Sequence, residues 1–250
     1  AVSRTRFYPP AGVMFQQVAT YSDVCPPDGS VLIHLAESRD IYQTEVNSER
    51  FMRDNIRICD SLLAKHSGFA IYASSVVVYG DQSDCSHKPT DVLHPLTTYA
   101  RSKVECEQRV LSAGGSVARL SNLYGPGMAS NSLVSEILAQ IPGKGPLKVR
   151  SVDPVIDFLW VDDAADAFIQ VVEREAKGVF NIASGNSISV GQLAKMALEI
   201  AGESERSVVS LQNTQSVSQI HLDASGTTNE LGWRSSTTID QGISKLIALC

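Results

Sequence analysis

Short apolar runs alternate regularly with longer amphipathic runs along the chain. The apolar runs predict buried strands at Val31–Ala36, Phe69–Ser75, Ser116–Leu120 and Gly178–Ile182. The amphipathic runs predict helices at Glu49–Lys65, Thr98–Ser112, Val161–Arg174 and Ser189–Ala201. Repeated strand–helix–strand units require right-handed crossovers, so the pattern indicates an α/β fold with a parallel sheet covered on both faces.

The second half of the chain changes character. Residues 126–154 are looser, with one expected helix over about 133–140 and a turn rich in Gly and Pro at Pro142–Pro146. A chain of 250 residues, 43% of them hydrophobic, can bury a sizeable core. We therefore expect one large domain with an appended lobe.

Composition excludes several classes of protein. The net charge is −6, so no basic nucleic-acid footprint is present, and no apolar run is long enough to span a bilayer. The five cysteines form no C-x-x-C pair, which argues against a zinc cluster and a disulfide scaffold. No signal peptide is visible. The expectation is a cytoplasmic protein without metal, membrane or nucleic-acid partners.

Two features carry chemistry. Tyr99 and Lys103 lie four residues apart in a predicted helix and therefore share one face. An ammonium beside a phenol is expected to lower the pKa of Tyr99, so that it can exchange a proton with a substrate near neutral pH. Ser74 and Ser75 end a buried strand, where a hydroxyl can donate to a substrate carbonyl. Alternatively, Tyr99 and Lys103 are exposed on the helix without a catalytic role, and the two serines only end the strand.

The order of these features resembles a known family. The stretches Tyr72–Gly80 and Pro95–Lys103 are similar to motifs of the extended short-chain dehydrogenase/reductase superfamily, and within it to the sugar-nucleotide epimerase/dehydratase family. The resemblance implies a Rossmann-type, doubly wound parallel sheet that binds NAD or NADP, formed by residues 1–125 and 155–185. It also implies a small C-terminal substrate lobe, formed by residues 126–154 and 186–250.

The resemblance also assigns roles to residues. It makes Ser75, Tyr99 and Lys103 catalytic. It places Arg4, Asp23, Ala36, Asn55, Tyr99, Lys103 and Leu120 at the cofactor, and Ser75, Val76 and Asn122 at the substrate. Arg4, near Arg6, favours NADP because a basic residue there can accept a 2′-phosphate, although both arginines can equally be solvated loop residues.

The sequence departs from the family at its start. No G-x-x-G-x-x-G occurs, and residues 1–4 resemble the end of the family's second strand. The first strand, glycine-rich turn and helix are therefore missing from this sequence. Either the sequence is incomplete, or it is a natural short form that has lost the usual dinucleotide site.

Val76 and Val77 limit the reactions that the protein can catalyse, because the family's dehydratases have an Asp–Glu pair at these two positions. Dehydration is therefore disfavoured. The first hypothesis is a nucleotide-sugar 4-epimerase, the second is an NDP-keto-sugar reductase, and the third is a cofactor-deficient, non-catalytic homologue that acts as a binding module. By analogy with the family we expect a homodimer formed through the helix of Tyr99 and the preceding helix.

The other candidate residues are expected to have structural roles or to be solvated. Arginines that grip a nucleotide diphosphate in many members are absent here, and Lys144, Lys148 and Arg150 are either replacements or solvated loop charges. Asp162 and Asp163 are expected to favour a helix start rather than to bind metal. The two tryptophans, Trp160 and Trp233, are expected to pack in the core, and His87 and His94 to lie in a surface loop.

Overall fold

The computed structural model describes residues 1–3, 11–14, 16–37, 48–80, 86–212 and 220–249. The chain divides into two compact units. The first consists of Ala1–Val78, Leu93–Arg119 and Val171–Val179, and the second of Tyr79–Val92, Leu120–Gln170 and Phe180–Cys250. The domain bounds expected from the family resemblance stay a prediction.

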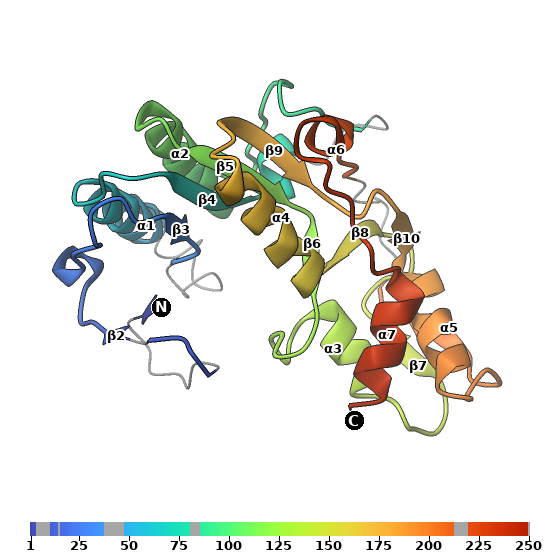
Figure 1. Cartoon of the computed structure of the whole chain (residues 1–250). Helices are drawn as coiled ribbons and strands as arrows, with labels where there is room; N and C mark the ends of the chain where they lie inside the picture. The colour runs from blue at the N-terminus through green and yellow to red at the C-terminus, as the bar shows by residue number, and fades with distance from the viewer. Residues whose placement is uncertain (4–10, 15, 38–47, 81–85, 213–219, 250) are drawn as a thin grey trace. The chain divides into compact units, whose positions relative to one another are not determined.

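A four-stranded sheet has the order β3 (Leu32–His34), β4 (Ala70–Ser75), β5 (Ser116–Leu120) and β9 (Gly178–Ile182), as Figure 1 shows. Strands β3 and β4 are parallel, with Ile33 opposite Ile71. Each of the four coincides with an apolar run of the sequence, and β5 is buried along its whole length. The expected α/β fold with a parallel sheet is confirmed.

Helices α1 (Ser48–Leu63) and α2 (Thr98–Ser112) pack against each other beside β4. The Thr97 hydroxyl accepts the amide of Ala100 at 3.1 Å, which caps the N-terminus of α2. The chain then turns through Gly114, which has a φ of +78°, and Gly115, where a Cβ would lie 2.6 Å from the carbonyl oxygen of Ala70. These two glycines therefore allow α2 to lead directly into β5.

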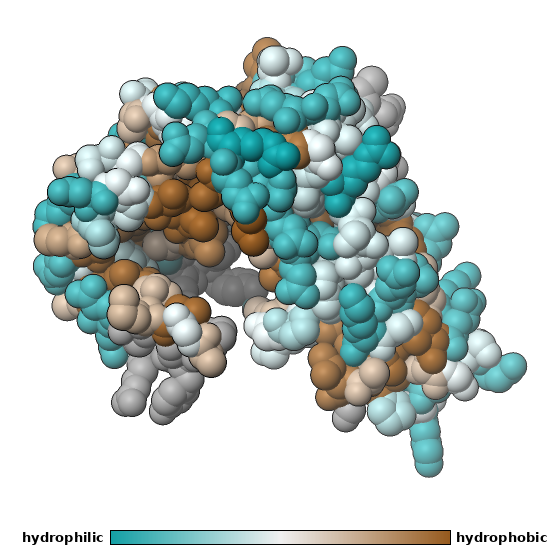
Figure 2. All heavy atoms as spheres, in the orientation of Figure 1, coloured by the Kyte–Doolittle hydropathy of each residue, from teal (hydrophilic) through white to brown (hydrophobic). Residues whose placement is uncertain are grey.

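Strand β3 has two different faces. Leu32 packs on a small core cluster that includes Val18 and Ile58, and His34 is buried. The alternate residues Val31, Ile33 and Leu35 are 40%, 45% and 66% exposed. In Figure 2 brown, apolar side chains gather over this part of the molecule. The first unit also holds a small parallel sheet of β1 (Val2–Ser3) and β2 (Gln16–Gln17), followed by the short helix η1 (Tyr21–Asp23).

The second unit is built on a three-stranded sheet with the order β10 (Ser187–Ser189), β8 (Val155–Trp160) and β6 (Asn122–Tyr124). Strands β7 (Leu147–Val149) and β11 (Val208–Ser210) form a parallel pair. The helices are α3 (Leu133–Leu138), α4 (Val161–Glu173), α5 (Val190–Ile200), α6 (Ser225–Leu231) and α7 (Ile239–Ile247). The last three residues of α4 belong to the first unit. Ser189 caps α5 with a capping box, as its place before the apolar run predicts.

The carboxylate of Asp163 anchors the segment before α7. It accepts hydrogen bonds from the Ser235 hydroxyl at 2.7 Å and from the Thr237 amide at 2.8 Å. Burial opposes ionisation, but these hydrogen bonds hold the pKa of Asp163 below its ordinary value. Asp163 therefore serves a tertiary contact as well as the helix start where it was expected. Trp160 and Trp233 are both buried, which confirms their expected packing. In the described part of the chain, no helix is long and apolar enough to cross a membrane.

Candidate active site

The Tyr99 and Lys103 side chains project from the first turns of α2. The Lys103 Nζ atom lies 5.4 Å from the centre of the Tyr99 ring and 5.0 Å from the centre of the Tyr72 ring, which β4 contributes. Lys103 is buried and Tyr99 is partly buried. The alternative that both side chains are simply exposed on the helix is therefore wrong.

The two serines at the end of β4 point to different partners because successive residues of a strand face opposite sides. The Ser74 hydroxyl is buried and donates to the carboxylate of Glu107 at 2.5 Å. The Ser75 side chain is partly exposed and forms a hydrogen bond with Tyr99. The structure thus brings Ser75, Tyr99 and Lys103 together, and it gives Ser74 a structural contact.

The electrostatics of Tyr99 differ from the expectation. Burial raises the pKa of the phenol, the nearby carboxylate of Glu37 raises it further, and the hydrogen bond with Ser75 opposes both. The predicted lowering of the pKa by Lys103 is wrong, because burial of the phenol, the larger cause, and the carboxylate of Glu37 both raise the pKa, and the spacing in the sequence reveals neither. Tyr99 is therefore a protonated phenol at neutral pH.

Lys103 is held from two sides. Its Nζ donates to the carbonyl oxygen of Ala73 in β4 at 2.9 Å, and it lies 3.3 Å from the Oε1 atom of Glu37, which follows β3. Sequence reasoning missed Glu37, since one acidic residue after an apolar run is usually a solvated charge. Only the approach of β3 and α2 in space gives it a partner.

His34, the last residue of β3, was also missed. It is 2% exposed, and neither ring nitrogen has a hydrogen-bond partner among the described residues. Burial, assisted by the charge of Lys103, lowers the pKa of His34 to about 4. The imidazole is therefore neutral at neutral pH, and its ring lies 5.0 Å from that of Tyr72.

A buried ion pair lies next to this site and connects α2 to the sheet. Glu107 lies one turn after Lys103 on α2, and its carboxylate pairs with the guanidinium of Arg119 in β5 at 2.7 Å. Their side chains are only 3% and 5% exposed. Together with Ser74, the pair ties α2 to both β4 and β5.

Four further residues predicted at the cofactor or the substrate belong to the first unit. Ala36 packs beside the small core cluster of the first unit, Asn55 is buried on α1, and Asp23 is exposed in η1. Val76 is buried directly after Ser75. Arg4, like Arg6, lies outside the described residues.

Two predicted residues belong to the second unit. Leu120 is buried at the end of β5, and Asn122 is exposed in β6. Their predicted roles at the cofactor and the substrate stay predictions.

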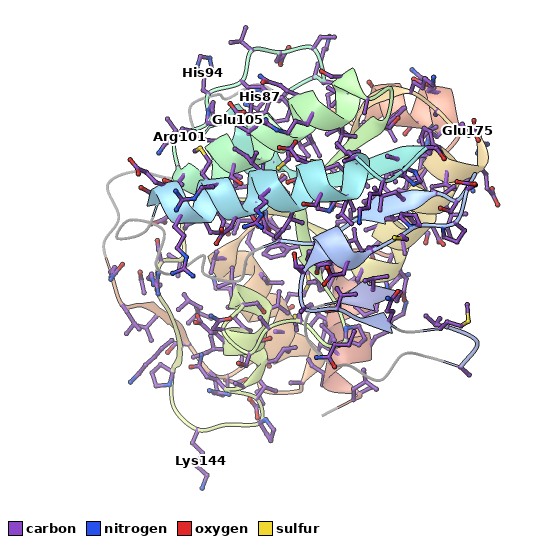
Figure 3. All side chains as sticks on the ribbon, turned by 90° about the vertical axis from the view of Figure 1, so that its left-hand side faces the viewer. His87, His94, Arg101, Glu105, Lys144 and Glu175 are labelled. Atoms are coloured by element: carbon purple, nitrogen blue, oxygen red, sulfur yellow. The ribbon has the colours of Figure 1, made fainter. Side chains whose placement is uncertain are left out.

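The three basic residues that are candidates for binding phosphate are exposed to solvent. Lys144, Lys148 and Arg150 are all exposed, and Figure 3 shows Lys144 extending outward from its loop. His87 is not a surface residue, contrary to expectation: its ring stacks on that of Tyr79 with centres 4.7 Å apart. His94, also labelled in Figure 3, is exposed as expected.

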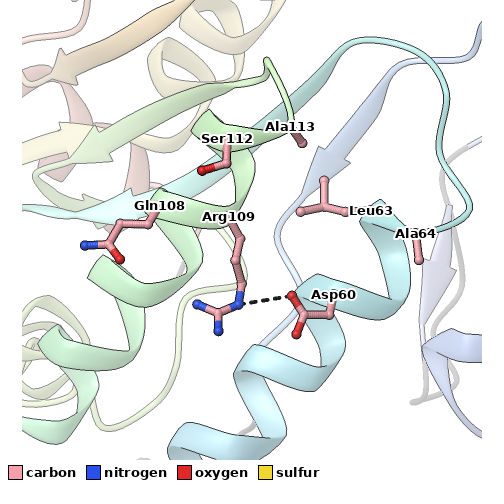
Figure 4. Close-up of a pocket in the computed structure, with 7 residues that line it drawn as sticks. All are labelled: Asp60, Leu63, Ala64, Gln108, Arg109, Ser112 and Ala113. Atoms are coloured by element: carbon pink, nitrogen blue, oxygen red, sulfur yellow. Dashed lines mark ion pairs between the residues drawn. The ribbon is translucent and has the colours of Figure 1, made fainter.

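An open groove of about 610 Å³ lies between the C-terminal parts of α1 and α2 (Figure 4). Its lining combines polar side chains with the apolar Leu63, Ala64 and Ala113, and an ion pair of 3.0 Å joins Arg109 and Asp60 across it. Ten residues separate Arg109 from Tyr99, which is about 15 Å along a helix. This groove is therefore separate from the cluster around Tyr99.

Comparisons with known proteins identify the family of the chain. A model of the NAD dependent epimerase/dehydratase family matches residues 22–183. The chain is 29% identical to dTDP-4-dehydro-6-deoxyglucose reductase of Escherichia coli over 234 residues, which covers 86% of this chain and 73% of the relative.

Two solved structures share the fold. RMD from Pseudomonas aeruginosa, complexed with NADPH, matches with a TM-score of 0.82 and 22% identity over 96% of this chain and 91% of that chain. The UDP-glucose 4-epimerase of Thermotoga maritima, solved with UDP-glucose, matches with a TM-score of 0.83 and 21% identity over 96% of this chain and 85% of that chain. The protein described here belongs to the NAD dependent epimerase/dehydratase family.

Proposed function

We propose that this protein reduces the carbonyl group of a nucleotide-linked keto-sugar with NADH or NADPH. The observation that carries the proposal is the meeting of Ser75, Tyr99 and Lys103 at the end of β4. The phenol is kept protonated, as a proton donor requires. The similarity to a dTDP-4-dehydro-6-deoxyglucose reductase supports the same reaction class.

The donor set fits the nicotinamide half of a dinucleotide. An ammonium has three N–H groups, and among the described residues Ala73 and Glu37 occupy two directions around that of Lys103. A third can meet a ribose hydroxyl. Binding of NADPH by the structurally similar RMD favours NADP, in line with the basic residue at Arg4. In the first unit, Asp23, Ala36 and Asn55 are further proposed cofactor contacts.

The reduced nicotinamide supplies a hydride to the carbonyl carbon when the cofactor is bound. The hydroxyl of Ser75 donates to the carbonyl oxygen, on which negative charge develops. The phenol of Tyr99 gives its proton to that oxygen, so the product is an alcohol and the phenolate takes a proton back from solvent. Lys103 would hold the cofactor beside Tyr99 through its third N–H group.

A 4-epimerase is the second candidate, supported by the structural similarity to a UDP-glucose 4-epimerase. The same serine and tyrosine can remove a proton from a hydroxyl and return it after the sugar has turned. Dehydration is not proposed, because Val76 and Val77 offer no group that transfers protons.

The direct test incubates the chain with NADPH and an NDP-4-keto-6-deoxy-sugar and follows both molecules. Oxidation of one NADPH for each alcohol formed supports the reductase. Interconversion of NDP-hexose epimers with catalytic NAD and no net consumption supports the epimerase. Absence of dinucleotide binding by calorimetry contradicts both and supports the non-catalytic binding module.

The residue that decides the mechanism is Tyr99. We expect Tyr99→Phe to lower kcat/KM about 10²- to 10⁴-fold, because the proton donor is lost while the ring and its packing remain. Tyr124→Phe is the matched control: its hydroxyl makes one 3.4 Å contact in the second unit. Full turnover by Tyr99→Phe, measured as initial rates, would reject this mechanism.

A further inference from the structure

Glu37 is the one carboxylate that pairs with Lys103 among the described residues. Its side chain is 20% exposed and that of Lys103 is 7% exposed, so the pair is largely shielded from solvent. Shielded charges interact more strongly than solvated ones because water screens them less. The contact therefore differs from the surface pairs of α1 and α2, such as Arg50 with Asp54.

The pair lies where three elements meet. Glu37 follows β3, Lys103 belongs to α2, and the carbonyl of Ala73 fixes the ammonium from β4. Tyr99 is close to both charges, with Lys103 Nζ 5.4 Å from its ring centre. The phenol therefore experiences the Lys103 cation together with the Glu37 anion.

We propose that Glu37 is a positioning residue, which holds the Lys103 ammonium against β4 and offsets the effect of its charge on the ionisation of the Tyr99 phenol. This inference rests on the proposed function and deepens it. Without the carboxylate, the ammonium would act on the phenol unopposed.

The other titratable groups of this cluster do not replace Glu37. From β3, the imidazole of His34 is neutral at neutral pH, because burial lowers its pKa to about 4. From β4, burial raises the pKa of Tyr72, so it too is uncharged. From α2, the Cys106 thiol contacts Tyr72, and from α1 the Cys59 thiol contacts Cys106. Among the described residues, Glu37 is thus the charged group that raises the pKa of Tyr99, in addition to the larger effect of burial.

The sign of the effect follows directly. Glu37 raises the pKa of Tyr99, so Glu37→Gln should lower it. An opposite charge left unbalanced within a few ångströms shifts a pKa by one or more units, so we expect the Tyr99 midpoint to fall by about one pH unit. At a fixed alkaline pH below both midpoints this gives about tenfold more phenolate.

The experiment follows tyrosine ionisation by NMR in the full chain with ¹³C at the tyrosine Cζ and no added cofactor. The chain has seven tyrosines, and the Tyr99 signal is assigned as the one missing from Tyr99→Phe. Glu105→Gln is the matched control: it removes a carboxylate from the same helix, where Glu105 pairs with Arg109 at the surface. We expect its Tyr99 midpoint to equal that of the unmodified chain.

Glu37→Asp keeps the charge but shortens its reach, so its midpoint should lie between those of the unmodified chain and Glu37→Gln. It also keeps the test decisive if Glu37→Gln does not fold. A midpoint unchanged or raised in Glu37→Gln, or equal in Glu37→Asp and the unmodified chain when only the aspartate variant folds, overturns the inference.

The NMR titration needs no turnover, so its outcome is separable from that of the proposed function. A lowered midpoint in a chain that reduces no keto-sugar supports the role of Glu37 toward Tyr99 and refutes the proposed reaction. If the enzyme reduces the keto-sugar but the titration midpoint of Tyr99 is the same in Glu37→Gln and the unmodified chain, only the inference about Glu37 is refuted.

Discussion

Several side chains at the ends of β3 and β4 are buried, but they carry different charges. Lys103 and Glu37 are paired, whereas His34 and Tyr72 are buried without a balancing charge and are held neutral. Burial disfavours the charged form of any group, and it raises the pKa of Glu37 even though Lys103 opposes this shift. Burial therefore affects the pKa values of this site more than pairing does.

His34 should make the stability of the protein depend on pH. Its pKa is lowered from 6.5 to about 4 in the folded state, so between these values the unfolded chain binds a proton that the folded chain does not. Stability is therefore lost as pH falls through this window, by up to about 3 kcal/mol. Urea unfolding at pH 7 and at about pH 4.5 measures this loss.

The variant His34→Leu should lose less stability over the same pH range, since leucine takes up no proton. His94→Leu, which removes an exposed histidine, should keep the loss seen in the unmodified chain. Equal pH dependence of the unmodified chain and His34→Leu would contradict the assignment.

At this scale the sequence predicted only part of the site. The spacing of Tyr99 and Lys103, four residues apart, was enough to place them on one face, and the end of a strand was enough to select Ser74 and Ser75. Alternation along the strand then separates the two serines. The shift of the Tyr99 pKa was predicted with the wrong sign, because the burial of the phenol and the approach of Glu37, which is 66 residues before Lys103 in the chain, arise only through the fold.

Among the elements, the sequence predicted the bounds of α2, β5 and β9 as the structure has them. For α2, Thr97 provides a cap and two glycines end the helix. Strands β6, β7, β8, β10 and β11 were missed. All but β8 have three residues, which is too short to show an alternating pattern, and pairing with a neighbour defines them.

The buried pair of Glu107 and Arg119 should dominate the attachment of α2. Removing one partner leaves an unbalanced buried charge, so we expect Arg119→Met to cost about 3–5 kcal/mol in the free energy of unfolding. The double variant Glu107→Met with Arg119→Met should recover part of that loss. Urea denaturation of the three proteins gives the comparison.

Arg109→Met is the control for this prediction. Arg109 pairs with Asp60 and Glu105 at the surface, with its own side chain 31% exposed, so its loss should cost about 1 kcal/mol or less. An Arg119→Met variant as stable as Arg109→Met would show that the buried pair contributes little.

At the scale of the whole molecule, we expect a homodimer formed through α1 and α2. The outer face of α1 has a shallow groove that is lined in part by the apolar side chains of Met52 and Ile56. Paired helices of this kind suit a two-fold interface, in which the same surface is used twice. Light scattering should give twice the chain mass of 26.9 kDa.

Ile56→Arg should then yield a folded monomer, because a charge would be buried in the interface. Val209→Arg places the same charge on a 40% exposed residue of the second unit and should stay dimeric. A monomeric mass for the unmodified chain would refute this quaternary structure.

The attachment of α2 to the sheet affects how Tyr99 and Lys103 reach their places when the chain folds. Because Glu107 lies one turn beyond Lys103 and is bound to both β4 and β5, the helix cannot detach without stranding a guanidinium inside the sheet layer. Detachment of α2 alone is thus penalised by about the 3–5 kcal/mol that an unpaired buried charge costs. A nascent or heat-stressed chain should therefore contain either the whole proton-transfer apparatus or none of it, with no half-assembled species exposing a reactive phenol.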